Sequence, residues 1–377
     1  MAPVFPAHAS RLETELMHIL HVVGARPNFM KVAPVHRVLA SRGISQSVVH
    51  TGQHYDAVMS ASVFEELGLP EPDVNLGVGS GSHAQQTAQV MVAFEDHLSK
   101  SRPDLLLVYG DVNSTMAATI TAVKLGIAVG HVEAGLRSGD RSMPEEINRL
   151  ITDRLAGLLF TPSKDGNDNL LSEGTDPQAI KFVGNVMIDT LERLLPAADG
   201  ERELRHFDLV KGAGPAPFVL VTLHRPSNVD DPATLTRLFA ALETIAAKIP
   251  VVFPVHPRTR ARMARFGIPH QRTILSEPLT YLPFLGLQRH AAVVVTDSGG
   301  IQEETTYLGI PCLTMRPNTE RPVTVTVGTN QVLGDDTDRL QAEVLAVLDG
   351  RGKKGSIPEL WDGHAAERIA DVLGAIA

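Results

Sequence analysis

The segment that decides the fold is the apolar run Ala291-Ala292-Val293-Val294-Val295 together with the residues after it, Thr296-Asp297-Ser298-Gly299-Gly300-Ile301-Gln302-Glu303-Glu304. Small residues directly after a strand form a turn that exposes the backbone N–H groups at the start of the next helix, where phosphate oxygens bind. The segment therefore predicts a strand, a phosphate-binding turn and a helix. A simple tight turn is the alternative interpretation of Ser298, Gly299 and Gly300.

The same alternation of short apolar runs and longer amphipathic stretches recurs along the whole chain. Each run is rich in β-branched residues and ends in glycine or a polar turn, which is typical of a parallel sheet with helical crossovers. The fold class that we predict is α/β, with two Rossmann-like, doubly wound domains facing a cleft. Strands are expected over residues 18–23, 47–50, 105–109, 128–132, 158–161 and 180–183, and again over 218–222, 251–255, 273–275, 293–296 and 312–315.

The length of 377 residues favours two domains. Residues 196–217 contain several glycines and prolines and show little periodicity, so we place the boundary there. We expect a flexible N-terminal extension over 1–16, a first domain over 17–195, a linker over 196–217 and a second domain over 218–364.

Composition excludes several classes of protein. Hydrophobic residues make up 43% and charged residues 20%, as in globular chains, and the formal charge of −9 argues against nucleic-acid binding. The only cysteine, Cys312, cannot form an intramolecular disulfide or a cysteine-based zinc site. The chain has no apolar run long enough to span a membrane, and residues 1–16 do not resemble a signal peptide. A cytoplasmic protein is expected.

Two cations follow the first strand. Arg26 and Lys31 lie at the start of a predicted helix, a placement suited to a phosphorylated leaving group, although solvated surface positions are the alternative. A dinucleotide fingerprint needs three glycines in this turn, and only Gly24 is present. A nicotinamide cofactor is therefore disfavoured.

Carboxylates follow the later strands of the first domain. Asp111 and Glu133 each come at the carboxyl end of a strand, so we expect them at the same edge of the sheet. Glu145 begins a further predicted helix. Carboxylates gathered in a partly desolvated site can supply both a general acid and a general base. The alternatives are a helix cap for Asp111 and a favourable first-turn charge for Glu145.

Polar residues also follow the strands of the second domain. His224 comes after the strand over 218–222 and can face the cleft, although a structural histidine is the alternative. Glu304 lies about one turn into its predicted helix, within reach of ribose hydroxyls, and Arg321 adds a cation after the next strand.

From about His18 to Gly334 the chain closely resembles the non-hydrolysing branch of the UDP-N-acetylglucosamine 2-epimerase family. The resemblance rests on residues 24–31, 110–111, 131–137, 144–149, 297–304 and 319–322, which occur in the family's order. It implies a glycosyltransferase-B-like fold, a homodimer, and no need for a metal or NAD. It also implies that a last helix over 365–376 returns to the first domain, and that the second domain binds UDP.

The resemblance assigns roles to individual residues. It implies that Asp111, Glu133, Glu145 and His224 are catalytic and that Arg26 and Lys31 bind substrate beside them. Ser298, Gly299, Gly300, Glu304 and Arg321 match the UDP-binding set, and Phe284 matches the platform for uracil.

The implied reaction interconverts UDP-N-acetylglucosamine and UDP-N-acetylmannosamine, a step of polysaccharide biosynthesis. Two departures keep alternatives open. Ser227 occupies the glutamate position of the family's His-Arg-x-Glu-Asn motif, and the early loop reads Gln53-His54-Tyr55-Asp56, a variant of relatives that act on diacetamido-uronic acid sugars. The alternatives are such a 2-epimerase, a hydrolysing 2-epimerase and a glycosyltransferase of the same fold.

Overall fold

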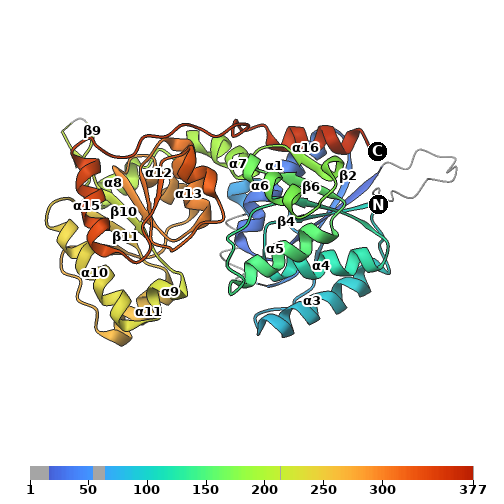
Figure 1. The fold of residues 1–377 in the computed structure, drawn as a ribbon, viewed down its shortest axis with the longest axis horizontal. Coiled ribbons are helices and arrows are strands. Elements are labelled where there is room, and N and C mark those ends of the chain that lie inside the picture. Colours follow the sequence, from blue (N-terminus) through green and yellow to red (C-terminus); the bar gives the residue numbers. More distant parts are fainter. Residues whose placement is uncertain (1–16, 54–63, 213, 377) are drawn as a thin grey trace. The chain divides into compact units, whose positions relative to one another are not determined.

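The computed structural model describes residues 17–53, 64–212 and 214–376. The chain forms two compact units (Figure 1). The first consists of Met1–Thr190 and Glu359–Ala377, and the second of Leu191–Pro358.

The first unit contains a parallel sheet in the strand order β3-β2-β1-β4-β5-β6-β7. The chain starts in the middle, winds outward through β2 and β3, then returns past β1 to β4, as in a doubly wound Rossmann-like sheet. Helices α3, α4 and α5 form one layer, and α1 packs against α16 in the other (Figure 1). The strands are β1 (His18–Val23), β2 (Ser45–His50), β3 (Val74–Asn75), β4 (Leu105–Tyr109), β5 (Ala128–Val132), β6 (Leu158–Thr161) and β7 (Ile180–Phe182). The helices are α1 (Arg26–Ser41), α3 (His83–Leu98), α4 (Asn113–Lys124), α5 (Pro144–Leu155), α6 (Lys164–Ser172), α7 (Val186–Leu194), which contains the unit boundary, and α16 (Ala365–Gly374).

The second unit repeats this winding with the order β12-β11-β10-β13-β14-β15. Its strands are β10 (Val219–Thr222), β11 (Val251–Pro254), β12 (Ile274–Ser276), β13 (Val293–Thr296), β14 (Cys312–Thr314) and β15 (Asn330–Val332), with a separate antiparallel pair, β8 (Val210–Lys211) and β9 (Gly214–Pro215). The helices are α8 (Glu201–His206), α9 (Pro226–Val229), α10 (Pro232–Ala246), α11 (Pro257–Phe266), α12 (Tyr281–Gln288), α13 (Gly299–Leu308), α14 (Pro322–Thr326) and α15 (Thr337–Leu348).

Alternation along the strands builds two cores in the second unit, one on each face of the sheet. Val219 and Val221 belong to the core that α10 and α15 cover, whereas Leu220 belongs to the core under α8 and α12. Val293 and Val294 divide between the two cores in the same way. A strand covered on both faces needs apolar residues at consecutive positions, which explains the continuous apolar runs in the sequence.

The predicted α/β fold class with doubly wound parallel sheets is confirmed, and every apolar run that we expected to be a strand is one. The short strands β3, β8, β9 and β15 were not predicted, since runs of two or three residues carry no readable periodicity. Residues 196–217, expected as a linker, belong to the second unit. The reason is that Leu204, Phe207 and Leu209 are buried in the core under α8 and α12.

The C-terminal helix α16 belongs to the first unit. The Asp189 carboxylate accepts hydrogen bonds from the first N–H groups of α16, at 3.1 Å from Ala365 and 2.7 Å from Ala366. Burial raises the pKa of Asp189 to about 6 against the opposite effect of these two hydrogen bonds. Within the described part of the chain, no helix is both long enough and apolar enough to cross a membrane.

His21 is one of the buried histidines in the sheet of the first unit. His21 of β1 is fully buried, with Nδ1 2.7 Å from the Tyr109 hydroxyl and Nε2 3.0 Å from Gln46 Oε1. Gln46 donates its amide N–H to the His36 carbonyl, so its oxygen faces His21 and can only accept. The neutral ring, with its hydrogen on Nε2, satisfies both neighbours. Burial lowers the pKa of His21 to about 3, and the charge of His36 adds to this effect.

We predict that His21 makes the stability of the protein sensitive to acid. The unfolded chain takes up this proton near pH 6.5, whereas the folded chain resists it down to about pH 3. The contribution of neutral His21 to the free energy of unfolding is therefore complete above pH 6.5. Below that pH it falls by about 1.4 kcal/mol per pH unit. Urea unfolding measures how far the free energy of unfolding drops between pH 6.5 and pH 4.5. This drop should be smaller by about 2–3 kcal/mol in His21→Gln, which cannot titrate, than in the wild type. Parallel pH profiles for the two proteins would contradict this account.

Candidate active site

A buried ion pair lies at the carboxyl edge of the first sheet. Lys31, in the second turn of α1, contacts the Glu133 carboxylate just beyond β5, and the exposed fractions of the two side chains are 7% and 4%. Glu133 has a backbone φ of 75°, a left-handed conformation that is uncommon for residues other than glycine. The partner of Lys31 in the structure is thus the Glu133 carboxylate.

Gly110 makes room for this pair. Its φ is +63°, and a Cβ there would lie 2.7 Å from Lys31 Nζ and 3.0 Å from Glu133 Oε2. A side chain at this position would push the pair apart. Because β4 and β5 are parallel neighbours, Gly110 after β4 lies beside the residues after β5. The structure thus brings Asp111 and Glu133 to the same edge of the sheet, as expected.

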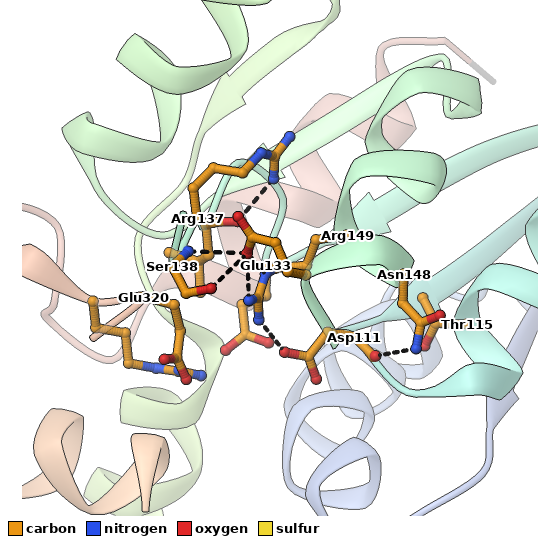
Figure 2. Close-up of polar contacts among 12 residues, drawn as sticks. Asp111, Thr115, Glu133, Arg137, Ser138, Asn148, Arg149 and Glu320 are labelled. Atoms are coloured by element: carbon orange, nitrogen blue, oxygen red, sulfur yellow. Dashed lines mark hydrogen bonds and ion pairs between the residues drawn. The ribbon is translucent and has the colours of Figure 1, made fainter. Parts of the chain in front are cut away.

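Asp111 is held by an arginine that the sequence analysis did not single out. Arg149 Nη1 lies 2.5 Å from Asp111 Oδ2, and the exposed fractions of the two side chains are 2% and 26%. Figure 2 shows this guanidinium directed at the Asp111 carboxylate. The Asn148 amide donates a hydrogen bond of 2.8 Å to the Asp111 carbonyl oxygen. The helix-cap alternative for Asp111 is wrong, since the N-cap residue of α4 is Val112. Arg149 lies within residues 144–149, one of the segments on which the family resemblance rests, and that was the available signal.

The two glutamates in the first turn of α5 have different environments. Glu146 is buried and accepts hydrogen bonds from the Ser138 N–H at 2.9 Å and the Gly139 N–H at 3.0 Å, beside an ion pair with Arg149. Burial alone would raise the pKa of Glu146, but these partners hold it below its ordinary value. Glu145 is only half-buried. Its position agrees equally with a site residue and with a first-turn charge.

Some of the residues expected at the site lie outside the described part of the structure. Helix α1 begins at Arg26, whose side chain lies outside the described part of the structure. In the early loop, Gln53 is buried and accepts hydrogen bonds from Ser114, at 2.7 Å from its hydroxyl. Residues 54–56 lie outside the described ranges.

In the second unit, a buried aspartate organises the end of β10. Asp297 is fully buried and accepts hydrogen bonds from the backbone N–H groups of His224, at 3.0 Å, and Arg225, at 2.9 Å, and from the Asn228 amide at 3.0 Å. His224 Nδ1 lies 3.2 Å from Asp297 Oδ1, and the His224 side chain is 41% exposed. His224 is thus an oriented, accessible imidazole. Neither Asp297 nor Arg225 was among the predicted site residues.

The predicted phosphate-binding turn follows β13. Ser298 is the N-cap residue of α13, and Gly299 and Gly300 form its first turn. A Cβ at Gly299 would lie 2.5 Å from Arg321 Nη1, so Arg321 packs directly on the turn. Small residues here leave the helix start open and admit the guanidinium.

Arg321 and Glu304 both have protein partners. Arg321 is buried between Glu303, at 2.8 Å, and Glu320, at 2.5 Å, and Glu320 also pairs with Arg316. Arg321, predicted as a cation after β14, is thus buried and paired with two carboxylates. Glu304 accepts a hydrogen bond from the Tyr281 hydroxyl at 3.2 Å. Phe284, on the same helix as Tyr281, is half-buried against the core under α8 and α12.

The side chains in residues 17–53, 64–212 and 214–376 include no group of three or more histidine, cysteine, aspartate or glutamate residues that could hold a metal ion. The polar groups at both sheet edges are ion pairs, oriented carboxylates and a helix start. Such groups can transfer protons and bind an anionic ligand.

Known proteins are similar to the chain over nearly its whole length. The family model described as UDP-N-acetylglucosamine 2-epimerase matches residues 14–374. UDP-N-acetylglucosamine 2-epimerase from Methanocaldococcus jannaschii is 39% identical, covering 95% of this chain and 99% of the relative. UDP-2,3-diacetamido-2,3-dideoxy-D-glucuronate 2-epimerase from Pseudomonas aeruginosa is also 39% identical, covering 96% of this chain and all of the relative.

Solved structures agree with these relatives. The M. jannaschii enzyme in complex with UDP-GlcNAc and UDP matches with a TM-score of 0.86 and 38% identity, over 95% of this chain and 100% of the other. The UDP-GlcNAc 2-epimerase from Neisseria meningitidis bound to UDP-GlcNAc matches with a TM-score of 0.86 and 29% identity, with coverage of 95% and 100%. The glycosyltransferase-B-like fold is confirmed by these neighbours. On this evidence the chain belongs to the UDP-N-acetylglucosamine 2-epimerase family.

Proposed function

We propose that the protein is a non-hydrolysing UDP-N-acetylglucosamine 2-epimerase that interconverts UDP-N-acetylglucosamine and UDP-N-acetylmannosamine. The observation that carries this proposal is the edge of the first sheet, where Asp111 and Glu133 come together, each paired with a buried cation. Relatives with this activity in their names cover nearly the whole chain and support it.

The chemistry explains why carboxylates and an anion site belong together. The hydrogen on carbon 2 of the sugar has no neighbouring carbonyl, so a carboxylate cannot remove it directly. If the bond from carbon 1 to UDP breaks, the cationic character at carbon 1 acidifies that hydrogen. Loss of the proton by anti elimination gives a glycal and UDP. Re-addition of UDP at carbon 1, with a proton on the other face of carbon 2, gives the epimer.

We assign proton transfer to Asp111 and Glu133. Both lie at one edge of the sheet, where a sugar ring could present carbon 2 to them. Lys31 contacts Glu133, so we place Lys31 with the proton-handling groups as well as with substrate binding. Glu145 and His224 would orient the substrate and stabilise charge. Arg26 would bind the departing phosphate.

We assign UDP binding to the second unit. The start of α13, at Ser298, Gly299 and Gly300, would accept the phosphates through backbone N–H groups. Glu304 would bind the ribose hydroxyls, and Phe284 would stack on uracil. Arg321 would contribute to the phosphate site from its position against Gly299, with Glu303 and Glu320 holding it there.

A 2-epimerase of a UDP-diacetamido-uronic acid is the second candidate. The P. aeruginosa relative with that activity in its name is 39% identical, as is the M. jannaschii relative, and the sequence Gln53-His54-Tyr55-Asp56 favours this candidate. We further propose a cytoplasmic homodimer in polysaccharide biosynthesis, without nucleic-acid or membrane partners and without a cofactor.

Incubations with defined substrates separate these functions. Purified protein is mixed with UDP-N-acetylglucosamine and the anomeric signals are followed by proton NMR. Appearance of UDP-N-acetylmannosamine supports the proposal, whereas free N-acetylmannosamine with UDP identifies a hydrolysing enzyme. No change, followed by turnover of the diacetamido-uronic acid substrate, identifies the second candidate. Dependence on an added acceptor identifies a glycosyltransferase.

The elimination route makes a prediction in heavy water. Because the proton on carbon 2 leaves and another returns from the solvent, the epimer formed in deuterium oxide should carry deuterium at carbon 2. Mass spectrometry and the loss of the carbon 2 proton signal measure this incorporation. Product that keeps the original hydrogen would disprove elimination.

Removing the charge of Glu133 tests its role. We expect Glu133→Gln to lose at least ~100-fold in kcat, the usual scale of general acid–base catalysis. The dissociation constant for UDP, measured by calorimetry, should change little because Glu133 is not among the groups proposed to bind UDP. The matched control is Glu71→Gln, which removes an exposed carboxylate of the same unit. A near-normal rate in Glu133→Gln would remove this residue from the mechanism.

A further inference from the structure

One buried carboxylate of α5 contacts the turn that carries Glu133. The Asp153 side chain is only 1% exposed. Its Oδ2 accepts hydrogen bonds from the Gly135 N–H at 3.0 Å and from Arg137 Nη1 at 2.7 Å. Gly135 follows Glu133 by two residues, so Asp153 holds the β5–α5 turn from its buried side.

His131 connects the same carboxylate to the other loop of the edge. The ring is fully buried, with Nδ1 2.6 Å from Asp153 Oδ1 and Nε2 2.9 Å from the Gly110 carbonyl oxygen. Both neighbours accept hydrogen bonds, so the ring satisfies both only when each nitrogen carries a hydrogen. Gly110 directly precedes Asp111. Asp153 therefore reaches the Asp111 loop through one histidine.

The surroundings keep Asp153 a carboxylate. Burial alone would raise its pKa, but the charge and hydrogen bond of His131, and then those of Arg137, hold the pKa of Asp153 below its ordinary value. Arg137 is fixed in turn by Glu173, with 2.8 Å from Nε to Oε1 and 2.8 Å from Nη2 to Oε2. Four charged or polar side chains thus form one connected cluster beneath the edge.

One of the two loops that this cluster contacts holds a non-glycine residue, Glu133, in a left-handed backbone conformation. Gly110 and Glu133 have left-handed backbones, with φ of 63° and 75°. Such conformations in non-glycine residues persist when the surrounding structure determines them. Catalysis that uses two separate carboxylates is sensitive to their spacing, since a displacement of about 1 Å can cost about 100-fold in rate.

We propose that Asp153 is a positioning residue that holds the loops of Asp111 and Glu133 in their mutual geometry, directly at Gly135 and through His131 at Gly110. The proposal rests on the proposed function for the roles of Asp111 and Glu133. At 1% exposure, Asp153 acts through its neighbours and not on the substrate.

The first test is Asp153→Asn, which keeps the size of the side chain but turns an N–H group toward one of the donors. We expect kcat to fall roughly 10- to 100-fold, with the KM for the UDP-sugar and the Kd for UDP unchanged within about twofold. The matched control is Asp189→Asn, which alters a buried carboxylate of the same unit that accepts two backbone N–H groups of α16. Assays run well below the melting temperature of each variant. The control should melt earlier and keep its kcat, whereas a normal kcat in Asp153→Asn would overturn the proposal.

The second test asks whether His131 and Asp153 act through one connection. His131→Asn alone should also lower kcat with an unchanged KM. If both residues hold the same loops, the double variant loses no more than the worse single variant. Losses that multiply would overturn the connection. His131→Asn also keeps the proposal testable should Asp153→Asn fail to fold.

Hydrogen exchange separates this proposal from the proposed function. In Asp153→Asn, peptides covering residues 110–111 and 133–137 should exchange at least about tenfold faster than in the wild type, while Asp189→Asn leaves them unchanged. A wild-type protein that epimerises no UDP-sugar would disprove the proposed function and leave this readout intact. Equal exchange in Asp153→Asn and the wild type would overturn the positioning role.

Discussion

The ion pair between Lys31 and Glu133 is the interaction on which the edge of the first sheet depends. Both charges are buried, and a buried charge without its partner costs about 3–5 kcal/mol. For Glu133 to reach Lys31, the backbone after β5 takes a left-handed turn, and the residue after β4 must lack a side chain. The glycine at 110 and the unusual φ of Glu133 are thus consequences of one pairing. Asp111 directly follows Gly110, so the turn that leaves room for the ion pair also places Asp111.

Neutralised clusters of charge recur in both units. Asp111 is paired with Arg149, and Asp153 with His131 and Arg137. In the second unit, Glu303, Glu320 and the two arginines Arg316 and Arg321 form a comparable buried set. Asp297 differs, because backbone and amide N–H groups surround it and its contact with His224 leaves that ring 41% exposed. Asp111 and Asp153 are thus paired with cations, whereas Asp297 orients a histidine.

The organisation of the site was predictable where it follows from topology. Parallel strands bring their carboxyl ends to one edge, so Asp111 and Glu133 could be placed together from their positions after two strands. The partners of these carboxylates could not. Arg149 is separated from Asp111 by 38 residues and Asp153 from His131 by 22, and each pair joins a helix to a strand end. Such pairings depend on how α5 packs and rotates against the sheet, and local sequence patterns carry no information about that packing. The same reason explains why the pairing of Arg321 with Glu303 could not be predicted.

What the sequence determined by itself is the set of elements and their class. Consecutive apolar β-branched residues specify strands covered on both faces, and the small residues after β13 specify an open helix start, because both effects act over a few neighbouring residues. The motifs also identified the family. What only the tertiary structure decided is which charges meet: Lys31 with Glu133, Arg149 with Asp111, and Asp153 with His131 and Arg137. These contacts join residues far apart in the chain, and burying a charge is tolerated only where folding supplies its partner.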